Sequence, residues 1–228
     1  MGDHAEPWRQ HPVLEALREL EQRDRELAAR IEELTQLEAE IASLRAEAAR
    51  LDAFAASLPS LRERAGSEVR EAQAELARRI GVVCGAEAQL GSADDRAAAK
   101  RTLATAQTAH ADAEARLARL KAEAERIEHE AAAAEQIAAA LAERARALAE
   151  RAGGDLDQGI EPWAARARAT VFAQRTHAEG ERVQVQTEAS ELASSVTGEA
   201  VAGDVALARR ATERALEARH QLKHAGNP

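Results

Sequence analysis

Few side chains in this 228-residue sequence have the type and spacing that metal binding or catalysis requires. The acidic group that suggests a calcium site is Asp155, Asp157 and Glu161. A calcium-binding EF-hand loop has glycine at its sixth position and a bidentate glutamate at its twelfth. Counted from Asp155, the glycine here is fifth (Gly159) and the twelfth residue is Arg166. We therefore favour a polar loop between helices over a calcium site.

The histidines and the cysteine give equally little support for catalysis. His220 and His224 are one helical turn apart, which suits a metal, but no neighbouring carboxylate or thiol completes a ligand set. Near a helix C-terminus such side chains also interact favourably with the helix dipole, so metal binding there stays open. His110 occupies a core heptad position, where a polar residue more often sets the register than catalyses. Cys84 is the only cysteine, which excludes an intrachain disulfide and a thiolate zinc cluster.

We accordingly expect no catalytic residue, no metal, no cofactor and no enzymatic activity. The sequence contains no glycine-rich phosphate-binding loop and no nucleophile elbow. A formal net charge of −9 argues against nucleic acid as the main partner, because phosphate backbones require a basic surface. The basic residues are interleaved with glutamates, as on a solvated helix face with ion pairs one turn apart.

The elements that position these residues are predicted to be long helices. Aromatic residues make up only 2% of the chain, and alanine is abundant, as in thin bundles whose helix axes approach closely. Residues 103–152 carry two uninterrupted tracks of mainly small and apolar residues. Taken together, the two tracks alternate at spacings of three and four, so they are the a and d positions of about seven heptads. One track is Leu103, His110, Leu117, Ala124, Ala131, Ala138, Ala145 and Ala152, and the other is Ala106, Ala113, Leu120, Ile127, Ala134, Leu141 and Leu148.

A similar pattern predicts a first long helix from about residue 12, although Asp24 interrupts one of its apolar tracks. Ile31, Leu34 and Leu37 are separated by two successive spacings of three, a stammer that moves the apolar stripe around the helix. Pro59 either kinks this helix or breaks it, with Ser60 and Glu63 as a capping box for a restart. We favour the kink, because the apolar spacing continues through the proline.

Turn residues divide the remaining chain. Gly91, followed by a capping box of Ser92 and Asp95, predicts a turn near 91–92. Gly153-Gly154 predicts a second turn over 153–160, and Pro162 opens the next helix beside Trp163. In that helix residues 183–186 alternate as in a strand, but an isolated strand has no partner, so we expect helix. Gly198 and Gly203 weaken it, and Asp204 is suited to cap a final piece.

The predicted fold is all-α: an elongated antiparallel helical bundle or coiled coil of three long arms, 12–90, 93–152 and 161–222, because short connections make neighbouring helices antiparallel. It contains four or more helices if the chain also breaks at Pro59 and near Gly198–Asp204. We expect one domain over 12–224, a flexible lead-in over 1–11 and a disordered tail over 225–228. The Ala-rich stretch 131–140 is expected to be the tightest helix contact.

A length match predicts where a partner binds. If the first arm reaches the turn near 91–92, residue 152 lies opposite roughly residue 32, and residues 12–31 project beyond the hairpin. Their apolar side chains then form a candidate surface for self-association or for a protein partner. This surface comprises Val13, Leu14, Leu17, Leu20, Leu27 and Ile31. The alternative is that the segment packs within the chain after a break at Pro59.

We therefore expect a non-enzymatic coiled-coil scaffold or adaptor that acts through protein–protein contacts. The alternative is a membrane-surface helical protein, similar to stress-coat proteins or helical toxins, that rearranges onto lipid. Membrane binding is the less favoured, because large apolar residues are sparse in the last helix. The first residues lack the features of a signal peptide, and no apolar run approaches the roughly 20 residues of a membrane span. We expect a cytoplasmic protein, with a composition typical of GC-rich bacteria.

Overall fold

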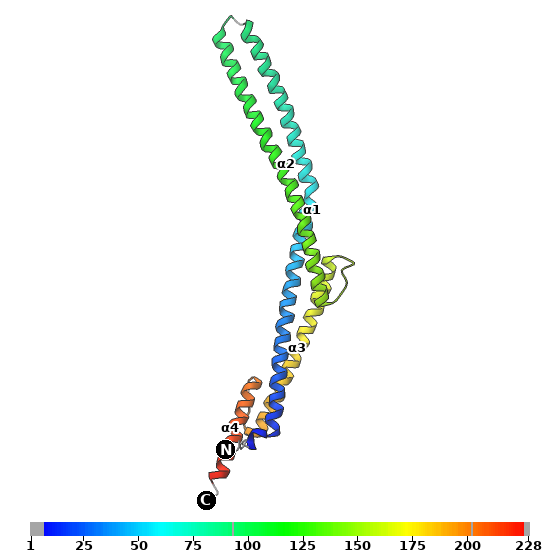
Figure 1. Ribbon diagram of the computed structural model, residues 1–228, viewed down its shortest axis with the longest axis vertical. Coiled ribbons are helices and arrows are strands. Elements are labelled where there is room, and N and C mark those ends of the chain that lie inside the picture. The colour runs from blue at the N-terminus through cyan, green and yellow to red at the C-terminus, as the bar shows by residue number, and fades with distance from the viewer. Residues whose placement is uncertain (1–6, 93, 202, 226–228) are drawn as a thin grey trace, which may run out of the picture. The chain divides into compact units, whose positions relative to one another are not determined.

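The computed structural model describes residues 7–92, 94–201 and 203–225 and, within them, an all-helical fold (Figure 1). A short 3-10 helix, η1 (Pro7–Gln10), precedes four α-helices. These are α1 (Pro12–Ser92), α2 (Arg96–Ala152), α3 (Ile160–Thr197) and α4 (Val205–Ala225). The prediction of an all-α helical bundle is confirmed. Contacts divide the chain into two compact units: residues 46–145, called the hairpin unit below, and residues 1–45 with 146–228, called the bundle unit.

The hairpin unit consists of the second part of α1 and most of α2, which run antiparallel side by side (Figure 1). Its buried side chains are mostly small, and those of α2 follow the predicted heptad tracks. The buried side chains are Ala48, Ala72, Ala86, Ala106, Ala113, Leu117, Ile127, Ala131, Leu141 and Ala145. Ion pairs join the two helices, with Arg62 Nη2 lying 2.6 Å from Glu128 Oε2 and Arg144 Nη1 lying 3.0 Å from Glu47 Oε1. A thin apolar seam flanked by charges therefore holds this unit together.

Pro59 lies inside α1 and does not end it. Proline removes one backbone N–H donor from a helix. A helix tolerates this loss at an exposed position if the flanking turns remain packed. The predicted capping box at Ser60 does not form, because its hydroxyl donates to the carbonyl oxygen of Ser57 (2.8 Å) within the continuous helix. The alternative of a helix break at this proline is therefore wrong.

The turn between α1 and α2 follows the predicted position near 91–92, because Gly91 and Ser92 both belong to α1 and α2 begins at Arg96. Gly91 does not have the positive φ of a C′ glycine, so it does not end the helix. Asp95 Oδ1 accepts hydrogen bonds from the backbone N–H groups of Ala97 and Ala98, both at 3.0 Å. Ser92 is instead the last residue of α1. An N-cap aspartate satisfies N–H groups that have no partner within the helix, so the capping box starting at Ser92 is a wrong prediction.

The bundle unit is built around the first part of α1, against which α3 and α4 pack. Its main core cluster contains Leu17, Leu20, Leu27, Ala178, Val185, Ala189, Ala193, Val205 and Ala208. A smaller cluster of Leu14, Val196 and Leu216 is extended by Trp8 and Val13. Alanines on α3 give the leucines of α1 room to interdigitate, as in close helix packing.

This core corrects the predicted overhang of residues 12–31. Leu14 and Leu17 are completely buried, Leu20 and Leu27 are each 8% exposed, and Val13 and Ile31 are partly buried against the same core. The length match counted only the hairpin partner of α1, whereas α3 and α4 cover this segment within the chain. The exposed apolar surface on which the predicted partner site depended is absent from these described residues.

Two loops shape the bundle unit. Gly153 and Gly154 end α2 with φ of 77° and 106°, in the left-handed region that favours glycine. Trp163, 1% exposed, donates its indole N–H to the carbonyl oxygen of Gly153 (3.3 Å) and so closes the loop onto α3. The second loop separates α3 from α4, which confirms the alternative of a break near Gly198–Asp204. Asp204 caps α4 by accepting from the N–H of Leu207 (2.8 Å), as predicted.

The predicted chain ends lie only partly within the described residues. Residues 1–6 of the expected lead-in and residues 226–228 of the expected tail lie outside them. Residues 7–10 form η1, and the Trp8 side chain packs against the core cluster around Leu14. This part of the lead-in is therefore ordered by burial of the indole. Residues 183–186 are helical, as expected.

Candidate interaction surfaces

The acidic residues 155–161 do not converge on a cation. Asp155 Oδ1 accepts a hydrogen bond from the backbone N–H of Asp157 (3.0 Å), which forms a local turn. Glu161 instead forms a bidentate pair with Arg45, whose hydrogen bonds lower the pKa of this carboxyl below its ordinary value. Hydrogen bonding to Asp155, reinforced by repulsion between the two carboxyls, raises the pKa of Asp157. The arrangement is that of a polar loop.

The histidines and the cysteine are also dispersed. His110 is half-buried, with its Nδ1 atom 3.7 Å from Glu114 Oε2 on the next turn. Cys84 is exposed. His220 lines a pocket in the bundle unit, whereas the side chain of His224 lies outside the described part. The described residues contain no group of three or more histidine, cysteine or acidic side chains that could hold a metal ion.

A largely apolar hollow lies on the hairpin unit and has a volume of about 450 Å³. We call it the hairpin groove. It is lined by Glu47, Arg50, Leu51 and Phe54 of α1 and by Glu130, Ala133, Ala134 and Ile137 of α2. The large side chains come mainly from α1, and short alanines face them from α2. Since alanine cannot fill the space beside Leu51 and Phe54, a groove remains open there.

This groove corrects the prediction that residues 131–140 form the tightest helix contact. Ala131 is buried, but Ala134 is only half-buried and residues 135–140 are exposed. Ile137 leaves 54% of its surface exposed beside the groove. A run of small residues permits close approach but does not enforce it, and here it leaves apolar surface uncovered.

The charged side chains around the hairpin groove differ in whether they form ion pairs. Glu47 pairs with Arg144 across the hairpin, and Glu130 pairs with Arg126 one turn away (2.9 Å). Arg50 lines the same groove and is exposed, but the described residues provide it with no ion pair. The groove therefore combines an apolar floor with one guanidinium available to an acidic group.

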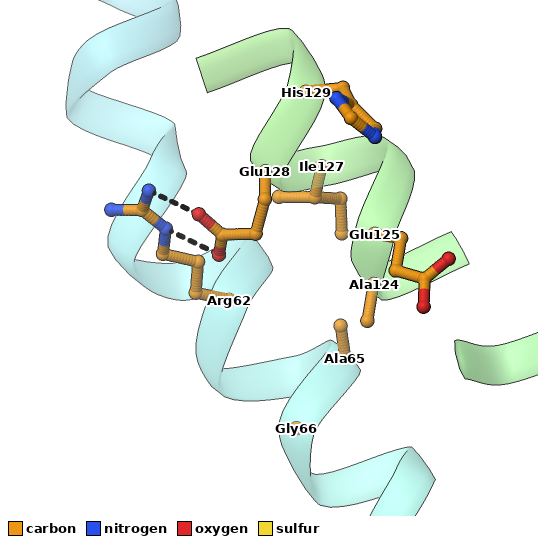
Figure 2. A pocket seen from close by; sticks show the side chains of 8 residues that line it. All are labelled: Arg62, Ala65, Gly66, Ala124, Glu125, Ile127, Glu128 and His129. Atoms are coloured by element: carbon orange, nitrogen blue, oxygen red, sulfur yellow. Dashed lines mark hydrogen bonds and ion pairs between the residues drawn. The ribbon is translucent and has the colours of Figure 1, made fainter. Parts of the chain in front are cut away.

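A second hollow of the hairpin unit, of about 400 Å³, is lined in part by an ion pair (Figure 2). Arg62 donates to both carboxylate oxygens of Glu128 (2.9 and 2.6 Å), while Ala65 and Ala124 face each other beside the pair. The hydrogen bonds raise the pKa of the Arg62 guanidinium and lower that of the Glu128 carboxyl. Because these two groups satisfy one another, this hollow offers a ligand little compared with the hairpin groove.

Sequence reasoning missed the hairpin groove although a signal was present. Leu51 lies on a predicted heptad track, but Ile137 lies on neither track of α2, three residues after Ala134. A large apolar residue beside a heptad seam widens the apolar face beyond what two helices bury. That pattern predicts apolar surface that the two helices alone leave uncovered.

In comparisons with known proteins, no family model, curated protein or solved structure matches the chain. None of the helices in the described residues has an apolar stretch long enough to cross a bilayer.

Proposed function

We propose that this chain is a non-enzymatic coiled-coil scaffold or adaptor that acts through protein–protein contacts. The observation that carries the proposal is the hairpin groove, where Phe54 and Ile137 remain partly exposed beside Arg50, which forms no ion pair with the described residues. A two-helix unit has no further layer of its own to cover this face. Its natural complement is one amphipathic helix laid along the groove, a common mode of protein recognition.

The groove specifies the chemistry of the partner helix. Apolar side chains at spacings of three and four on that helix are expected to contact Leu51, Phe54 and Ile137. A glutamate or aspartate beside this stripe pairs with Arg50, because a guanidinium binds a carboxylate through two parallel hydrogen bonds. The apolar contacts supply most of the affinity, and the ion pair sets the orientation of the helix.

A pair of matched variants tests the proposal. Ile137→Glu places a charge in the groove, whereas Ala139→Glu places the same charge on an exposed position of the same helix outside it. Tagged wild type and both variants are used for affinity isolation from the native host, after circular dichroism has shown equal helix content. We expect one partner to be retained by wild type and Ala139→Glu and depleted at least fivefold with Ile137→Glu, since at least about 1 kcal/mol of apolar burial is lost.

Two results contradict the proposal. One is equal recovery of all bound proteins by the three forms, because the groove then contributes nothing to their binding. The other is a stoichiometric metal ion or nucleotide in the purified chain, found by elemental analysis and absorbance, together with no groove-dependent partner. That combination indicates an enzyme or carrier rather than a scaffold.

A further inference from the structure

A second pocket, independent of the hairpin groove, lies in the bundle unit between η1 and α4. It has a volume of about 530 Å³, and we call it the η1–α4 pocket. Its walls are Trp8, His11, Leu216, Arg219, His220, Leu222 and Lys223. Trp8 and Leu216 belong to the apolar cluster around Leu14, so a packed core supports one side of the pocket. Leu222 is 74% exposed.

Every ionisable side chain that lines this pocket is basic. The helix that provides most of them, α4, carries four arginines and one lysine against two glutamates, in a chain whose net charge is −9. Arg219 is held in place, because its Nη2 donates to the carbonyl oxygen of Val196 in the last turn of α3 (2.6 Å). The guanidinium of Arg9 lies 5.4 Å from the centre of the Trp8 ring and adds a further cation beside the pocket. A local basic site favours an anionic ligand there even though the chain as a whole is acidic.

The apolar residues of the pocket indicate which class of anionic ligand fits it. Leu222 exposes most of its side chain next to Lys223, and Trp8 presents an aromatic ring with a polar N–H. Lysine and arginine beside leucine and tryptophan form the combination that binds at a bilayer surface, where anionic headgroups overlie acyl chains. A free phosphate ion satisfies the cations but leaves Leu222 in water.

We propose that the η1–α4 pocket binds the phosphate-bearing headgroup of an anionic lipid at a membrane surface. The headgroup lies among His11, Arg219 and Lys223, and Leu222 enters the interfacial region of the bilayer. The remaining acidic surface is repelled by the same membrane, so the chain contacts lipid through this pocket. The scaffold proposed above does not depend on this site, and failure of either proposal leaves the other unaffected.

Co-sedimentation of the full chain with vesicles tests the inference. Phosphatidylcholine vesicles with and without phosphatidylglycerol are compared at low and high salt. We expect binding only to the anionic vesicles, and weaker binding at high salt because exposed charges are screened. Lys223→Gln is expected to weaken binding about fivefold, and Leu222→Gln about tenfold. The matched control is Arg210→Gln, which removes one exposed charge from the same helix outside the pocket and leaves binding nearly unchanged.

Iodide quenching of Trp8 separates the sources of phosphate, since Trp163 is buried and contributes little. Anionic vesicles are expected to protect Trp8, and inorganic phosphate alone is not. The inference is overturned if the chain does not sediment with anionic vesicles. It is equally overturned if Lys223→Gln and Arg210→Gln weaken binding by the same factor, which indicates diffuse attraction without a pocket. Protection of Trp8 by inorganic phosphate or by a glutamate-rich peptide, without vesicle binding, assigns the pocket to a soluble ligand instead.

Discussion

Removing the carboxylate of Asp24 is expected to destabilise the bundle unit. Asp24 is the residue that interrupts an apolar track of α1, and its side chain is only 13% exposed. It accepts hydrogen bonds from Arg182 Nε (2.9 Å), Arg182 Nη2 (3.3 Å) and Gln186 Nε2 (3.1 Å) on α3. Hydrogen bonding to Asp24 raises the pKa of Arg182, so this guanidinium remains charged. The interruption is thus a polar link between two packed helices.

The magnitude follows from these contacts. A hydrogen bond to a charged group contributes about 1.5–3 kcal/mol. The Arg182 side chain is 37% exposed and regains water in Asp24→Ala, so we take about 1.5 kcal/mol for the loss. Alanine is the better helix former and offsets roughly 0.5 kcal/mol. The free energy of unfolding is therefore expected to fall by about 1 kcal/mol.

Urea unfolding followed by tryptophan fluorescence measures this change, because both tryptophans, Trp8 and Trp163, belong to the bundle unit. Glu19→Ala, at an exposed position of the same helix, is the control and is expected to change stability by less than about 0.5 kcal/mol. A double-mutant cycle with Arg182→Ala isolates the pair, with an expected coupling near 1 kcal/mol. A coupling of zero refutes the reasoning.

Three further predictions concern single features of the fold. Pro59→Ala restores a backbone N–H inside α1 and is expected to raise the melting temperature of the chain; an unchanged or lower value means that the proline is already accommodated without cost. Trp163→Ala removes a side chain that is 1% exposed together with its hydrogen bond to Gly153, and is expected to cost about 3–5 kcal/mol in urea unfolding; a cost below about 1 kcal/mol contradicts its place in the core. The pKa of Glu128 is lowered by its hydrogen bonds to Arg62 from an ordinary value of 4.5, so the stability from this pair is present above that pH and lost as the pH falls through the lower folded pKa. Thermal unfolding between neutral pH and acid is accordingly expected to depend less on pH for Glu128→Gln than for wild type, and identical profiles argue against a contribution from this pair.

Local periodicity explains why the helices could be predicted from the sequence. Leu117, Ile127 and Leu141 lie on heptad tracks and are buried, because helical repeat alone decides which side chains share a face. Glycine signals near 153 and 198 marked helix ends for a similar local reason. The cap of α2 at Asp95 was harder to predict, since two neighbouring residues, Ser92 and Asp95, both suit an N-cap.

Packing between distant segments could not be predicted in the same way. The burial of Leu17 and Leu20 depends on how α3 and α4 return along α1, which no local pattern determines. The small residues Ala189 and Ala193 on α3 were a signal for close packing, but they do not name their partner. The position of Ile137 beside the heptad seam was a sequence signal for uncovered apolar surface, but it does not show that Phe54 of α1 lines the same groove.

The central claim, that the hairpin groove receives a partner helix, is tested most directly by site-specific photocrosslinking. A benzophenone amino acid is placed at Ala133, which lines the groove and is exposed, or at Ala139, which is exposed outside it. After irradiation in the native host, we expect a covalent adduct with one partner from Ala133 and none from Ala139. The same adducts from both positions, or none from Ala133, contradict this claim.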